Sequence, residues 1–356
     1  MKTMYLLISL VLTAFFVNTT LPEQKENLKM TDIQVIGSHN SYKVAIEKPL
    51  FEYLLQKNPA LSGLEYEHIS LSEQLELGLR SLELDVFHDP EGGYYSNPKG
   101  LEIVKAAGAE PMPFDEEQKL QTPGLKVFHV QEIDFRSHQL VFKEALKELK
   151  SWSDANEGHN PIIITINTKD SEIPDTRKPL PFDAEALKNL NAEILAVFSQ
   201  ERLVTPDLVR GDFDTLEEAV LEQGWPQLNK VQNRFLFVLD EGGKKMETYL
   251  SSYSNLKGAA LFVNQEEGNP TAAFRILNDP IESFEQIKKL VSLGYMVRTR
   301  ADANTQEARD NDYNRFEKAK ASGAQIITTD YYLPSTLFKS DFKVSFENNS
   351  YERIRE

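Results

Sequence analysis

The sequence has 356 residues, no cysteine and a formal net charge of −16 at pH 7, and 40% of its residues are hydrophobic. This length suits one large domain, and the absence of cysteine excludes disulfides, thiolate metal sites and a cysteine nucleophile. The negative charge argues against nucleic acid as a partner, so any anionic ligand needs a local group of cations or a metal ion.

The first twenty residues have the layout of a secretory signal peptide. Lys2 precedes an apolar run from Met4 to Val17, and polar residues follow. This run is shorter than the ~20 residues that a spanning helix needs. We therefore interpret residues 1–20 as a signal peptide, with an uncleaved anchor as the alternative, and expect a secreted or periplasmic protein without a transmembrane domain.

Eight short apolar runs that end in polar residues follow along the chain, and helical patterns separate most of them. Continuous apolar runs are typical of strands that are buried on both faces. Their alternation with helices predicts an α/β fold, a (β/α)8 TIM barrel. The predicted strands are 33–40, 81–87, 125–129, 161–167, 234–240, 259–264, 295–300 and 325–330.

The sequence contains no convincing linker. We therefore assign residues 28–340 to a single catalytic barrel domain. The segment 88–124 is rich in Gly and Pro, and we expect a long loop over one barrel mouth. Residues 341–356 are expected to form a polar C-terminal tail.

Oxygen-bearing side chains lie where the first two predicted strands end, which is where barrels carry their chemistry. Glu83 and Asp85 are two residues apart in a strand and so point to the same face. Two adjacent carboxylates repel each other unless a cation lies between them. With Asn40, they form a hard ligand set suited to Ca²⁺ or Mg²⁺ and not to Zn²⁺. The alternative is an outward-facing or salt-bridged pair.

Two histidines and three cations complete the set of candidate residues. His39 and His129 follow the first and third predicted strands, and a histidine pair beside a metal suits proton transfer in phosphoryl chemistry. Packed or surface histidines are the alternative. Lys169, Arg298 and Arg300 are candidates for gripping phosphate. They are equally compatible with an ion-pair network that involves nearby aspartates.

The motifs "GSHNSYK", "LELDVFHDP", "FHVQEIDFRS", "VRTRADANTQEARDND" and "SGAQIITTDYY" resemble one family over about residues 31–335. This family is the secreted bacterial type of Ca²⁺-dependent phosphoinositide-specific phospholipase C, within the PLC-like phosphodiesterase superfamily. The resemblance implies that His39 is the general base near the inositol 2-hydroxyl and that His129 protonates the leaving oxygen. It also implies that Asn40, Glu83 and Asp85 bind Ca²⁺.

The implied reaction cleaves phosphatidylinositol, or a related inositol phospholipid, to diacylglycerol and inositol phosphate through a cyclic phosphate. The implied partner is phospholipid at a membrane surface, and we expect a monomer. One residue departs from the family pattern: Asn167 stands where eukaryotic relatives carry a glutamate as a further metal ligand. An asparagine can ligate Ca²⁺ through its carbonyl, but it brings no charge.

Two other functions remain open at this point. Glycerophosphodiester phosphodiesterases also use a histidine pair and a Glu-x-Asp metal pair, although they usually begin with His-Arg where this chain has His39 and Asn40. A non-catalytic barrel that binds a lipid headgroup or a glycan is an alternative of another class. We disfavour it because degenerate relatives should first lose the histidines or carboxylates, and this chain retains them.

Overall fold

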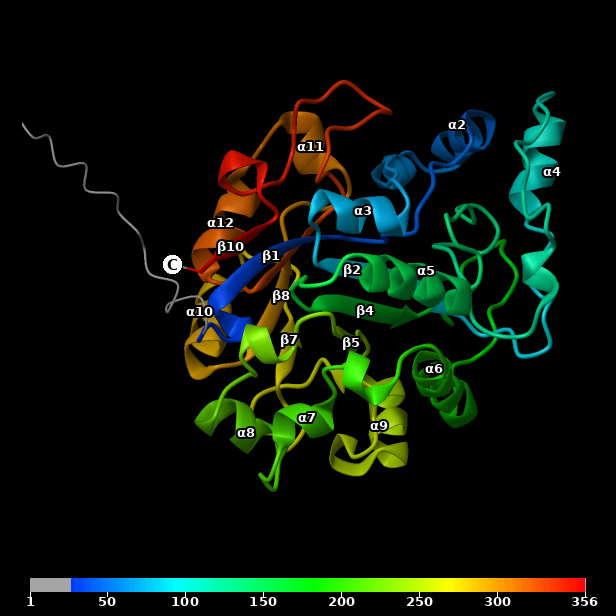
Figure 1. Cartoon of the computed structure of the whole chain (residues 1–356). Helices are drawn as coiled ribbons and strands as arrows, with labels where there is room; N and C mark the ends of the chain where they lie inside the picture. The colour runs from blue at the N-terminus through cyan, green and yellow to red at the C-terminus, as the bar shows by residue number, and fades with distance from the viewer. Residues whose placement is uncertain (1–26, 356) are drawn as a thin grey trace, which may run out of the picture.

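The computed structural model describes residues 27–355, shown in Figure 1. The predicted signal peptide, residues 1–20, lies outside the described residues. Within residues 27–355, no helix has both the length and the apolar character that crossing a bilayer would require.

Eight parallel strands form the wall of a barrel, in the order β6–β5–β4–β2–β1–β9–β8–β7. A parallel bridge between Asn264 and Phe274 joins the two ends of this series. The predicted (β/α)8 barrel is therefore confirmed. The wall strands are β1 (Ile33–Ser38), β2 (Ser81–Phe87), β4 (Ile162–Thr168), β5 (Phe235–Leu239), β6 (Leu261–Val263), β7 (Phe274–Ile276), β8 (Met296–Arg300) and β9 (Ile326–Thr329).

One predicted strand does not belong to the wall. The run 125–129 contains only β3 (Lys126–Val127), which pairs antiparallel with Val86 and Phe87 at the end of β2. The wall strand that we did not predict is β7, a three-residue strand with a charged residue, Arg275, at its centre in place of a continuous apolar run. His129 therefore follows a short antiparallel arm beside the carboxyl end of β2, and not the end of a wall strand.

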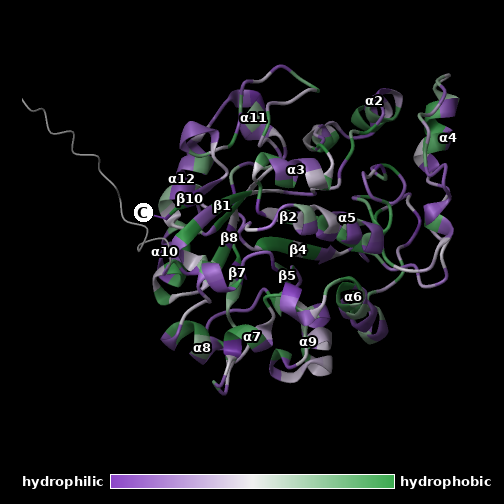
Figure 2. Cartoon of the chain, in the orientation of Figure 1, coloured by the Kyte–Doolittle hydropathy of each residue, from purple (hydrophilic) through white to green (hydrophobic). Residues whose placement is uncertain are grey.

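The helices surround the barrel, and Figure 2 shows their mixed polar and apolar surfaces around the largely apolar strands. In α5, buried residues at helical spacing, Phe142, Ala145, Leu146 and Leu149, face the core. The helices are α2 (Lys48–Lys57), α3 (Leu71–Leu77), α4 (Lys99–Ala106), α5 (Phe142–Ala155), α6 (Ala184–Val197), α7 (Pro206–Arg210), α8 (Leu216–Glu222), α9 (Gly243–Ser252), α10 (Phe284–Leu293), α11 (Gln306–Asp310) and α12 (Asn314–Ser322).

The segment 88–124, expected to be a loop, contains α4, which lies at the margin of the molecule (Figure 1). Val104 of α4 belongs to a small separate hydrophobic cluster with Leu50 and Leu54 of α2 and with Phe135. This cluster attaches the segment to α2, outside the main barrel core.

The C-terminal residues, expected to be a polar tail, pack against the barrel. Four of their side chains are buried in a cluster beside β1 and β9: Phe342, Val344, Phe346 and Tyr351. The strand β10 (Glu352–Ile354) then pairs antiparallel with β1. The end of the chain therefore covers the amino-terminal half of the strand that leads to His39.

We predict that Gly37→Ala destabilises the barrel. A Cβ at Gly37 would lie 2.5 Å from both Cβ and the backbone oxygen of Ser81, its partner on β2. Because backbone cannot move aside cheaply, the loss should be about 1–3 kcal/mol in urea unfolding. The matched control is Gly242→Ser, where a Cβ meets nothing within 4 Å and serine suits the helix N-cap. Equal stability of wild type and Gly37→Ala would contradict this prediction.

Candidate functional site

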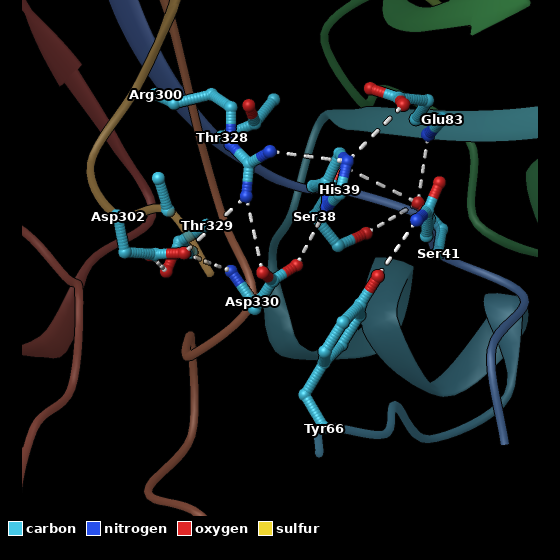
Figure 3. A network of polar contacts seen from close by, with 12 residues as sticks. Ser38, His39, Ser41, Tyr66, Glu83, Arg300, Asp302, Thr328, Thr329 and Asp330 are labelled. Carbon is cyan, nitrogen blue, oxygen red and sulfur yellow. Dashed lines mark hydrogen bonds and ion pairs between the residues drawn. The ribbon is translucent and has the colours of Figure 1, made fainter. Parts of the chain in front are cut away.

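His39, which immediately follows β1, is held between a carboxylate and a guanidinium (Figure 3). Its Nδ1 lies 2.9 Å from Oδ1 of Asp330, and its Nε2 lies 3.2 Å from Nη1 of Arg300. Arg300 also donates to Oδ2 of Asp330 at 3.1 Å. An ionised carboxylate can only accept, so Nδ1 carries the ring proton and Nε2 keeps its lone pair. The geometry prepares Nε2 to take up a proton.

Asp330 is ionised in spite of its burial. Burial opposes the charged form, but the neighbouring His39 and Arg300 outweigh it and hold the pKa of Asp330 well below its usual range. A second buried carboxylate, Asp302, accepts a hydrogen bond from the backbone N–H of Asp330 at 3.0 Å. Burial and the charge of Asp330 raise the pKa of Asp302 to about 7.

Glu83 of β2 is neutralised by Arg298 of β8. Arg298 donates through Nη2 to Oε2 of Glu83 and through Nη1 to Asn278, and it lies 3.5 Å from Oδ2 of Asp240. The other oxygen of Glu83 lies 3.7 Å from Nε2 of His39. Both Arg298 and Arg300 are therefore in ion pairs, which is the second of the two readings that the sequence left open.

Asp85 of β2 has a different partner set. Its Oδ2 accepts from Nζ of Lys169 at 2.9 Å and from the hydroxyl of Tyr42 at 2.8 Å. Its Oδ1 is buried and has no hydrogen-bond partner among the described residues. Glu83 and Asp85 thus share one face of β2 as predicted, and each carboxylate is paired with its own internal cation.

The two predicted amide ligands lie on either side of this pair. Asn40 has a left-handed backbone conformation (φ 48°) and donates from Nδ2 to the hydroxyl of Tyr66 at 2.7 Å. Asn167 is the register partner of Asp85 on β4, so the two side chains leave the sheet on the same side. The structure therefore brings Asn40, Asp85 and Asn167 to the ends of neighbouring strands.

His129 belongs to a second polar group at the same mouth. Its Nδ1 lies 2.8 Å from Oδ2 of Asp134, and Oδ1 of Asp134 accepts from Nζ of Lys43 at 2.8 Å. Lys43 comes four residues after His39. The short segment 39–43 therefore contains one histidine and is linked to the other through the contact of Lys43 with Asp134. Sequence reasoning missed Asp134, Lys43 and Tyr66, because their contacts depend on loop paths that carry no periodic pattern.

The donor set fits a hard divalent cation such as Ca²⁺. Asn40, Glu83, Asp85 and Asn167 offer oxygen atoms only, and the buried Oδ1 of Asp85 is an acceptor without a partner. The described residues contain no group of three or more His, Asp or Glu side chains arranged to hold a metal. A metal ion held by these residues would have two carboxylates and two neutral amides as ligands. Lys169 and Arg298 would then have to share or release those carboxylates.

Comparisons with known proteins point to one family. The family model described as "Phosphoinositide phospholipase C, Ca2+-dependent" matches residues 28–355. The solved Ca²⁺-dependent phosphoinositol-specific phospholipase C of a Pseudomonas species is similar in structure, with 14% identity, a TM-score of 0.56, and coverage of 93% of this chain and 96% of that chain. The corresponding Streptomyces antibioticus enzyme has 17% identity, a TM-score of 0.53, and coverage of 88% and 99%. No curated protein matches the sequence.

We predict that the free energy of unfolding of Asp240→Asn increases relative to that of wild type as the pH rises. Burial, opposed by Arg298, raises the pKa of Asp240 to about 7, against about 3.9 in an unfolded chain. Between these values the unfolded chain releases a proton that the folded protein keeps. Wild type should therefore lose up to about 1.4 kcal/mol per pH unit relative to the variant, between pH 4 and 7.

Urea unfolding of both proteins from pH 4 to 8, with EDTA present, measures this difference. The exposed Asp212 provides the control Asp212→Asn, whose stability curve should run parallel to that of wild type. Parallel stability curves for wild type and Asp240→Asn would refute the raised pKa of Asp240.

Proposed function

The chain belongs to the family of Ca²⁺-dependent phosphoinositide phospholipases C, and we propose that it cleaves phosphatidylinositol or a related inositol phospholipid to diacylglycerol and inositol phosphate through a cyclic phosphate. One observation carries the proposal. His39 and His129 stand at the same barrel mouth, and each has its Nδ1 bonded to a buried carboxylate. Each ring therefore exchanges protons at Nε2: His39 accepts a proton there as the base in its neutral form, and His129 gives one from there as the acid in its imidazolium form.

In the first half of the reaction, His39 is the base. Its Nε2 takes the proton of the inositol 2-hydroxyl while that oxygen forms a bond to phosphorus. The imidazolium that results is stabilised by Asp330, which accepts from Nδ1 at 2.9 Å. Asp330 is thus a positioning residue for the base.

In the same displacement, His129 is the acid. The bond between phosphorus and the glycerol oxygen breaks, and Nε2 of His129 delivers its proton to that oxygen. The His129 side chain is 19% exposed, and the Asp134 side chain is fully buried. The His129 ring is therefore accessible from the barrel mouth, whereas the carboxylate that orients it is not. Water then opens the cyclic phosphate, with the two histidines in reversed roles.

Metal and cations act on the phosphate. Asn40, Glu83, Asp85 and Asn167 would hold Ca²⁺, which supplies positive charge at the phosphate and acidifies the 2-hydroxyl when bound. Lys169, Arg298 and Arg300 line the same mouth and bind the phosphate or the inositol ring. Their ion pairs hold them in place before the substrate arrives, which reduces the entropy lost on binding.

The setting of the reaction follows from the N-terminal segment and the substrate. The basic residue and apolar run within residues 1–20 direct the chain to a secreted or periplasmic location. The enzyme then meets phospholipid at a membrane surface, as a monomer.

We predict Ca²⁺-dependent turnover of phosphatidylinositol. The protein without residues 1–20 should release a cyclic inositol phosphate from phosphatidylinositol micelles with Ca²⁺ and not with EGTA, as followed by phosphorus NMR. His39→Ala and His129→Ala should each lower kcat about 10²–10⁴-fold, the usual contribution of acid–base catalysis.

Glycerophosphocholine and glycerophosphoinositol in parallel reactions test the closest alternative activity. Turnover of these soluble diesters without any product from phosphatidylinositol would replace the proposal with a glycerophosphodiesterase. Headgroup binding with no turnover of any substrate would favour a non-catalytic barrel.

We predict that Asp330→Asn lowers kcat about 10²–10⁴-fold with little change in KM, because the variant loses the anion that stabilises the His39 imidazolium. Asp302→Asn is the matched control. Asp302 is equally buried and contacts the Asp330 backbone, but it has no contact with the His39 ring. Equal losses in the two variants would show that the effect comes from general disruption and not from His39.

A further inference from the structure

We propose that Lys43 is a positioning residue for the reaction. Its buried ammonium holds Asp134 in the ionised form and orientation that keep His129 in one tautomer, with Nε2 facing the mouth. This inference rests on the proposed function, because it assumes that His129 is the acid. It adds Lys43, a residue to which the sequence analysis gave no role.

The geometry is a continuous chain of three side chains. Nζ of Lys43 lies 2.8 Å from Oδ1 of Asp134, and Oδ2 of the same carboxylate lies 2.8 Å from Nδ1 of His129. The side chains of Lys43 and Asp134 are both 0% exposed. Each oxygen of Asp134 thus has one partner, and rotation of the carboxylate would break both contacts together.

The charge of Lys43 matters because Asp134 is buried. Burial opposes the charged form of Asp134, but Lys43 first and then His129 outweigh it, and the pKa of Asp134 is lowered. A protonated Asp134 could donate to Nδ1 and leave the ring proton on Nε2. An ionised Asp134 can only accept, so Nδ1 keeps its proton in both forms of the ring: in the imidazolium that delivers its Nε2 proton, and in the neutral ring that later takes a proton back at Nε2. Lys43 therefore selects the tautomer through Asp134.

A purely stabilising role explains this pair less well. Taking a lysine and an aspartate out of water costs several kcal/mol per ion, and apolar replacements of buried ion pairs are often no less stable. Glu83, Asp85 and Asp330 are three other buried carboxylates paired with cations at this mouth, and each belongs to the proposed site or positions a residue of it. In the pair Lys43–Asp134, a buried cation likewise contacts a carboxylate, and that carboxylate contacts His129.

Lys43 also joins the two halves of the site. Its Nζ lies 4.9 Å from the centre of the Tyr66 ring, and the hydroxyl of Tyr66 accepts from Asn40. The titratable groups that face Asp134 besides His129 and Lys43 are the phenols of Tyr42 and Tyr66, whose pKa values are raised by burial. Both phenols are neutral near pH 7. Apart from the protonated form of His129, Lys43 is the one cation with a contact to Asp134 among the described residues.

The chain contains a matched control, Lys126. It is also 0% exposed and lies 3.3 Å from a buried aspartate, Asp89. It belongs to β3, three residues before His129, and its other contacts are carbonyl oxygens of Thr122 and Gly124. Lys126→Met therefore removes a buried cation of the same kind, close to His129 in sequence, without touching Asp134.

The test compares wild type, Lys43→Met, Lys43→Arg, Asp134→Asn and Lys126→Met by long-range ¹H–¹⁵N NMR of histidine-labelled protein, with His129→Ala to assign the resonances. At a pH where the His129 ring is neutral, we expect its Nδ1–H form in wild type, in Lys43→Arg and in Lys126→Met. We expect a mixture of tautomers in Lys43→Met and in Asp134→Asn. An unchanged His129 tautomer in folded Lys43→Met overturns the proposal.

Kinetics on phosphatidylinositol supply the second measurement. Lys43→Met should lower kcat about 10–10²-fold with KM unchanged. Lys43→Arg should recover most of the lost kcat. In a His129→Ala background, Lys43→Met should cause no further loss of kcat. Equal losses in Lys43→Met and Lys126→Met would reduce Lys43 to a structural residue. An inactive wild type would instead refute the proposed function, because the tautomer measurement does not depend on turnover.

Discussion

Buried charge must be paired, and this requirement shapes the whole barrel mouth. Three carboxylates that water cannot reach each lie against a cation from another element: Glu83 with Arg298, Asp85 with Lys169, and Asp330 with Arg300. Without these partners the desolvation of each carboxylate would cost several kcal/mol. The chain as a whole carries a charge of −16, yet its mouth is locally compensated. An anionic phosphate can therefore approach without the repulsion that the net charge would impose.

The segment after β1 links these pairs. Asn40 takes a left-handed turn, and the residues that follow it point toward different elements. His39 contacts Asp330, Asn40 contacts Tyr66, Tyr42 contacts Asp85, and Lys43 contacts Asp134. A histidine beside an asparagine at the end of a strand is thus the start of a segment with contacts to four other parts of the mouth. A change of one backbone angle here would move the proposed base, a proposed amide ligand and the proposed positioning residue of the acid together.

The sequence predicted the features that depend on periodicity and missed those that depend on loop paths. Glu83 and Asp85 share a face because strands repeat every two residues, and His39 lies at the mouth because β1 ends just before it. The apolar run around β3 has the same composition as a wall strand, so only its antiparallel pairing with Val86 and Phe87 distinguishes it. The contacts of Asp134 with His129 and with Lys43 join two loops. The geometry of these loops cannot be predicted from the spacing of residues in the sequence.

The pairing of β10 with β1 has a consequence for how the protein is made. β1 is made early in synthesis, but two of its partners are made late: β9, which pairs along one edge, and β10, which pairs with the first residues of the opposite edge. Until those strands emerge, the apolar strand β1 lacks these partners. Asp330, whose carboxylate contacts His39, has not yet been synthesised either. Contacts so distant in sequence form late in folding. The nascent chain therefore has no assembled centre before β9 and Asp330 have been made, and the order of synthesis delays activity until then.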